Sequence, residues 1–137
     1  MIIDYLMMFT TDAGQALTKA AASDFRLDFG QKSPTTGMDY GDLCAVFTVK
    51  SAVTGTLTIS LQDCDTEEGT YADVATGVEL TAPAAGTQVV IPVPRHHRRF
   101  MRANFGGAPT AGTVHGFITS GVQDNVPFEQ APTIKTA

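Results

Sequence analysis

Hydrophobic and polar residues alternate with a period of two in several short stretches of this chain. The clearest stretch is residues 56–62, where leucine or isoleucine occupies every second position and threonine, serine or glutamine lies between. Because successive side chains of a strand point to opposite faces, this pattern predicts a half-buried strand. Residues 43–49 alternate in the same way, and residues 52–55 between the two stretches predict a hairpin turn.

The alternation recurs in shorter runs along the rest of the chain. We predict further strands at residues 25–29, 71–75, 89–93, 99–105 and 114–120. Turn residues separate these runs, at residues 65–69, 83–86, 106–112 and 121–125. Seven or eight short strands at spacings of about 8–14 residues, with no convincing long helix, predict an all-β fold, an antiparallel sandwich or barrel.

One segment carries a helical signal. Residues 11–22 are rich in alanine, and Thr11 or Asp12 would serve as the N-cap. The segment has no clear apolar stripe, however, so the sequence leaves helix and non-helix open.

Both termini have the composition of extended arms. Residues 1–9 are unusually apolar for a chain end, and residues 124–137 contain two prolines and no strand-length alternation, as expected for a C-terminal tail. An apolar terminal segment that cannot complete its own core often packs against a neighbouring subunit. On this interpretation residues 1–22 are an N-terminal arm, with contact residues Ile2, Ile3, Tyr5 and Leu6. The alternative, that residues 2–9 form the first strand of the same sandwich, stays open.

Length and charge restrict the class of partner. A chain of 137 residues suits a single domain with its own core. Its net charge of −5 gives the whole molecule no attraction to nucleic acid or to an anionic membrane, so we expect neither as a partner. The N-terminus lacks the basic region and cleavage site of a signal peptide, and its apolar run is too short to span a bilayer. We expect a soluble protein made in a cytoplasm.

The two cysteines, Cys44 and Cys64, lie in or beside predicted strands. Their spacing matches no metal or redox motif, so we interpret them as buried free thiols. A disulfide between neighbouring strands is the alternative that the sequence leaves open.

Residue types that bind metals or catalyse reactions do not form a recognisable site. His96 and His97 would point to opposite faces of a strand and cannot readily share one ion, and His115 is alone in its region. The acidic turn at residues 63–69 resembles a calcium loop, but its glycine comes one position late, and Val74 stands where the bidentate glutamate should be. We therefore expect no enzyme, no metal and no cofactor.

A basic cluster is the strongest local anomaly of this acidic chain. Arg95, Arg98, Arg99 and Arg102 place four of the nine Lys and Arg residues within eight positions, after two prolines that suit a strand end or a sheet edge. Guanidinium groups pair bidentately with carboxylates, so we assign the four arginines to an interface with an acidic protein partner. A phosphate backbone and an ordinary solvated loop are the alternatives.

Four segments, taken in order, resemble the capsid cement proteins of tailed bacteriophages, of the Bordetella-phage jelly-roll type. They are the opening MIIDYLMMF with TDAGQALTKAAASDFRLDFG, the strand GTLTISLQDCDTEEGTY, the run IPVPRHHRRFMRANF, and the closing APTAGTVHGFITSGVQDNVPF. The resemblance implies one antiparallel jelly-roll β-sandwich of about eight short strands with extended terminal arms.

The same resemblance implies a structural role in the virion. A cement, or decoration, protein binds the outer surface of an icosahedral head and stabilises it by bridging subunits of the major capsid protein. Small homo-oligomers, dimers or trimers, would lie on the capsid exterior after synthesis in the host bacterial cytoplasm. The alternative is a β-sandwich module for carbohydrate or a host surface, which the lack of tryptophan disfavours because sugar sites use aromatic platforms.

Overall fold

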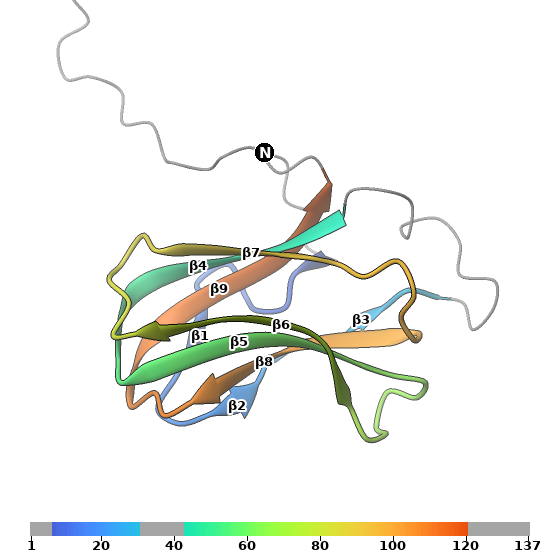
Figure 1. The fold of residues 1–137 in the computed structure, drawn as a ribbon, viewed down its shortest axis with the longest axis horizontal. Helices are drawn as coiled ribbons and strands as arrows, with labels where there is room; N and C mark the ends of the chain where they lie inside the picture. Colours follow the sequence, from blue (N-terminus) through green and yellow to red (C-terminus); the bar gives the residue numbers. More distant parts are fainter. Residues whose placement is uncertain (1–6, 31–42, 121–137) are drawn as a thin grey trace, which may run out of the picture.

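The computed structural model describes residues 7–30 and 43–120, which form two β-sheets packed face to face (Figure 1). Their strands are β1 (Gln15–Ala16), β2 (Ala21–Ala22), β3 (Leu27–Asp28), β4 (Leu43–Thr54), β5 (Thr56–Cys64), β6 (Ala72–Thr81), β7 (Gln88–Pro92), β8 (Phe100–Gly107) and β9 (Ala111–Ser120). The predicted turn at residues 121–125 and the predicted tail at residues 124–137 lie outside the described residues.

The strand order identifies the sandwich as a jelly roll. Sheet A has the order β1-β9-β4-β7, and sheet B has the order β2-β8-β5-β6, with β3 also paired to β8. The pairs are antiparallel and nested: β5 pairs with β6, β4 with β7, β2 and β3 with β8, and β1 with β9. Such nesting is one long hairpin rolled over into two sheets, so the predicted antiparallel jelly-roll β-sandwich is confirmed.

The predicted hairpin turn at residues 52–55 is wrong. Strand β4 belongs to sheet A and β5 to sheet B, so the two strands do not pair, and the chain changes sheet at Gly55. Gly55 has a φ of +93°, and its carbonyl accepts a hydrogen bond from the Ala82 N–H. Alternation shows that both segments are strands, but it carries no information about which strand pairs with which.

The helical signal at residues 11–22 is also not realised. Gly14, at φ +90°, closes a turn by donating its N–H to the Thr11 carbonyl, and the chain then continues as β1 and β2. Leu17 is buried in the core and donates its N–H to the Gly112 carbonyl. Because pairing to β9 and β8 satisfies the backbone and buries Leu17, tertiary contacts outweigh the helix propensity of the alanines.

The core lies between the sheets and is joined by three phenylalanines. Phe47 on β4 stacks on Phe9 at 5.7 Å between ring centroids, and Phe105 on β8 meets it edge to face at 6.0 Å. All three side chains are buried. A Cβ on Gly116 would lie 2.6 Å from the Phe47 ring, so a glycine is required there for the ring to fit between the sheets.

The last residues of the apolar N-terminus contribute to the sandwich. Met8 forms an isolated bridge with Phe117, and Phe9 donates its N–H to the Gly116 carbonyl at 2.8 Å. The end of the segment 2–9 therefore pairs along β9, as the first-strand alternative expects. Met7 packs against the core, and residues 2–6 lie outside the described residues.

Replacing Gly55 with alanine should destabilise the fold by more than about 2 kcal/mol in urea unfolding. Roughly 1 kcal/mol comes from placing a Cβ at positive φ, and the rest from a clash, because that Cβ would lie 2.3 Å from the Ala108 carbonyl oxygen. Gly86→Ala is the matched control, with φ +90° and no atom within 4 Å of the new Cβ, and should cost only about 1 kcal/mol. Equal losses in the two variants would contradict the close packing at the corner.

Candidate interaction surface

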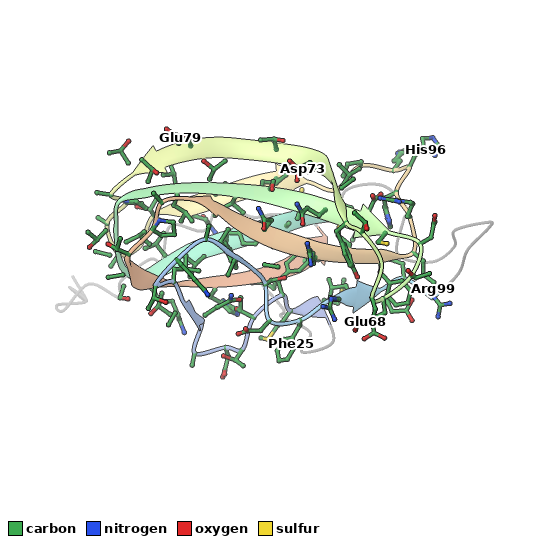
Figure 2. The ribbon with its side chains drawn as sticks, turned by 90° about the horizontal axis from the view of Figure 1, so that it is seen from below. Phe25, Glu68, Asp73, Glu79, His96 and Arg99 are labelled. Carbon is green, nitrogen blue, oxygen red and sulfur yellow. The ribbon has the colours of Figure 1, made fainter. Side chains whose placement is uncertain are left out.

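Arg95, Arg98 and Arg99 of the predicted basic cluster lie in the connection between β7 and β8, at one end of the sandwich, and Arg102 lies on β8 itself. Figure 2 shows His96, Arg99 and Glu68 near this same end. Pro92 ends β7, the edge strand of sheet A, which confirms the position that the prolines predicted. Val93 is buried and donates its N–H to the Leu43 carbonyl at 2.9 Å, so the connection is fastened to the sandwich where it begins.

Arg98 is held by a single buried carboxylate. Its backbone N–H and its Nε each donate to a different Asp63 carboxylate oxygen at 2.9 Å, and its Nη2 donates to the Asp63 carbonyl at 2.6 Å. The Asp63 side chain is 10% exposed, whereas that of Arg98 is 37% exposed. The hydrogen bond to Asp63 raises the pKa of Arg98 above its ordinary value. This arrangement locks the end of the connection onto β5.

Arg99 makes a bidentate pair with Asp28 on β3. Its Nε and Nη2 donate to the two carboxylate oxygens at 2.8 and 2.9 Å, and its guanidinium also lies over the Phe100 ring. The hydrogen bond from Arg99 holds the pKa of Asp28 below its usual value. Both side chains are partly exposed, so solvent weakens the pair.

Arg102 belongs to a polar ladder on the outer face of sheet B. Its Nε donates to the Gln62 side-chain oxygen at 2.9 Å, and Gln62 donates in turn to Asp73 at 2.9 Å. The Arg102 guanidinium also covers the ring of Tyr71 at 4.2 Å. The N–H edge and the planar face of the Arg102 guanidinium therefore both have partners within the chain.

Arg95 differs from the other three arginines. It is exposed, and among the described residues it has no ion pair or hydrogen bond. The acidic turn after β5 is likewise exposed, and Glu68 from this turn pairs with Arg26 at 3.2 Å. The cluster thus divides into three arginines with internal partners and one whose charge is directed to solvent.

The other residues that the sequence analysis singled out are the apolar N-terminal residues and the two cysteines. Ile2, Ile3, Tyr5 and Leu6 lie outside the described residues. Cys44 on β4 and Cys64 on β5 lie in different sheets and do not form a disulfide; Cys64 is buried as predicted, whereas Cys44 is only partly buried.

Among the described residues, the histidines and carboxylates do not gather into a metal site. His97 packs against Phe29 at 4.4 Å and donates from Nδ1 to the Arg98 carbonyl, while His96 is exposed. Within residues 7–30 and 43–120, no group of three His, Cys, Asp or Glu side chains is placed to hold a metal ion. In the same ranges, no helix is long and apolar enough to cross a membrane.

The sequence prediction missed the acids that pair with the arginines. For Asp63 a signal exists: it continues the inward-facing series of Leu57, Ile59 and Leu61 on β5, where an aspartate is out of place. A carboxylate at a core-facing position implies a buried cationic partner. No comparable signal marks Asp28, which is exposed.

Asp63→Ala should destabilise the protein by about 2 kcal/mol, because it leaves Arg98 without its charge-assisted hydrogen bonds. Asp65→Ala is the control, since it removes the same charge from an exposed residue two positions later and should change stability by less than about 0.5 kcal/mol. Denaturant unfolding of both variants measures the difference. Similar losses would show that Asp63 acts only through its charge.

The Asp28 pair should stabilise the fold near neutral pH and lose this effect in acid. The folded-state pKa of Asp28 lies below the ordinary 3.8, so its contribution is present above that value and disappears as the pH falls through the folded pKa. Asp28→Asn should therefore flatten the fall in the urea midpoint between about pH 5 and pH 2. Arg99→Gln, which removes the other partner of the pair, should flatten the slope in the same way. Identical slopes in all three proteins would contradict the role of Asp28.

Comparison with known proteins identifies a family. A search of curated proteins gives no match. The model of the Bbp16 family matches residues 11–118, from the turn before β1 into β9, and so spans both sheets of the sandwich. Because the matched residues are well over half of the 137 in the sequence, the chain belongs to the Bbp16 family, a family of Bordetella phage proteins.

Proposed function

We propose that this protein is a structural, non-enzymatic component of the virion, which binds the outer surface of an icosahedral phage head. In this role it stabilises the head by bridging subunits of the major capsid protein. The observation that carries the proposal is the membership in a phage protein family, over a complete jelly-roll body.

The packing of the sandwich supports a structural role. Two sheets enclose a continuous apolar core, and the polar groups at one end are joined to one another by ion pairs and hydrogen bonds. A body that keeps its shape loses little conformational entropy when it binds. A shell also repeats the same contact many times, so modest individual interfaces add up to strong attachment.

Within this proposal, Arg95 is the arginine best suited to meet an acidic partner. Its guanidinium is exposed and has no carboxylate partner among the described residues, whereas Arg98 and Arg99 would have to give up Asp63 and Asp28. Exposed pairs steer association and weaken with salt over a Debye length of about 8–10 Å. We also propose capsid contacts through the N-terminal residues Ile2, Ile3, Tyr5 and Leu6. Self-association into a dimer or trimer is part of the same proposal.

The alternative of a carbohydrate-binding module gains no support from Tyr71. The ring is buried, Arg102 covers it at 4.2 Å, and Arg26 lies 5.9 Å from its centroid. A ring that is engaged in this way does not offer a stacking platform to a sugar.

Co-sedimentation with heads that lack the protein tests the proposal. We expect wild-type protein to sediment with heads of the encoding phage at low salt and to raise the temperature at which the heads break open. Arg95→Ala should weaken binding by about threefold to tenfold, and Arg95→Lys, which keeps the charge, should weaken it less.

The outcomes test the capsid role and the role of Arg95 separately. Heads that neither bind nor gain stability from wild-type protein would refute the capsid role. If binding is normal and Arg95→Ala leaves it unchanged, the role of Arg95 is wrong while the capsid role stands. A variant lacking all four arginines is less informative, because loss of Arg98 and Arg99 also removes structural ion pairs.

A further inference from the structure

His115 is a buried histidine with an unsatisfied nitrogen. The residue is 7% exposed, and its Nε2 is buried without a hydrogen-bond partner among the described residues. The side chain lies on the outer face of β9, since the neighbouring Val114 and Gly116 positions face the core. Its ring meets Phe117 at 5.3 Å between centroids. A buried polar atom without a partner costs free energy, so something must justify its position.

The N-terminal residues form a flap beside this histidine. The chain is bonded to β9 at Gly116, which exchanges hydrogen bonds with Phe9 and with the hydroxyl of Thr10. It rejoins β9 at Val114, which pairs with Gln15. Residues 10–14 leave the strand between these two points, opposite His115, and we call them the flap.

The flap is attached firmly at its two ends and weakly in its middle. Phe9 is buried in the core on one side, and Gln15 is buried on the other. Between them, residues 11–13 are exposed, the Gly14 N–H closes the turn on the Thr11 carbonyl, and Lys50 donates to the Asp12 carbonyl. Opening the flap therefore breaks a few hydrogen bonds and exposes the buried Thr10, but it leaves the apolar core intact.

Protonation of His115 is unfavourable while the flap is closed. Burial lowers the pKa of His115, the nearby Lys50 ammonium lowers it further, and only the Asp12 carboxylate acts in the opposite direction. On the apolar side, Phe117 packs with Met8 and Val46 and offers the ring no acceptor. An imidazolium at this position needs water, and movement of the flap is the shortest way to admit it.

We propose that protonation of His115 opens the flap of residues 10–14, so that mild acid loosens the N-terminal segment from β9 while Phe9 stays in the core. The direction of the pH dependence of flap stability follows from proton linkage. With a folded pKa below 6.5, the closed flap is fully stabilised above about pH 6.5 and loses stability as the pH falls through the folded value. The device does not depend on the capsid role.

Amide hydrogen exchange by NMR tests the proposal on the wild-type protein. The reporters are the Gly14 N–H, bonded to Thr11, and the Gly116 N–H, bonded to the Thr10 hydroxyl. Between pH 7.5 and pH 5, after correction for intrinsic exchange, their protection should fall at least fivefold. The Val93 N–H, bonded to Leu43 far from the flap, should keep its protection.

Two further measurements test whether protonation of His115 causes the loss of amide protection. The imidazole resonances of His115 should titrate with a midpoint below 6.5 that coincides with the loss of protection. His115→Leu should keep the flap protected at pH 5, whereas His96→Leu, at an exposed histidine, should behave like wild type. Unchanged protection in the wild type, or an equal loss in His115→Leu, would overturn the proposal.

Discussion

The packing of Phe47 between the sheets is the interaction on which the rest of the structure depends. Its ring contacts Phe9 from the N-terminal segment and Phe105 from sheet B, in space that Gly116 leaves free on β9. This one cluster joins both sheets and holds the chain's first described residues against them. The flap beside His115 exists because Phe9 is fixed here and Gln15 is fixed six positions later.

The jelly-roll topology separates the connections into two ends. Nested pairing brings the β7–β8 connection, the β5–β6 turn and β3 together at one end of the sandwich (Figure 1). That end collects arginines and acids from distant parts of the sequence, and Arg98 and Arg99 pair there with Asp63 and Asp28. A cluster that looks like an exposed basic surface along the chain is, for three of its four arginines, a set of contacts within the chain that join the β7–β8 connection and β8 to neighbouring strands.

This result changes how the proposed capsid role should be sought. Charge clustering alone points equally to Arg95, Arg98, Arg99 and Arg102. The partners of the last three make Arg95 the residue whose charge is available to another molecule. The same reasoning singles out His115, whose Nε2 is the buried side-chain nitrogen without a hydrogen-bond partner among the described residues, and its neighbours show what its protonation would disturb.

Alternation of apolar and polar residues predicts β3 to β9 and the faces that they bury, because it is a local property of an extended chain, but it does not predict β1 and β2. Leu57, Ile59 and Leu61 are buried as their spacing predicts. Tertiary contacts fix which strands pair, place Gly55 between two sheets, and keep the alanine-rich residues before β3 from forming a helix. They also decide the partners of the arginines, because Asp63 and Asp28 lie 35 and 71 positions from Arg98 and Arg99. Contacts at such separations depend on topology and register, which local periodicity does not encode.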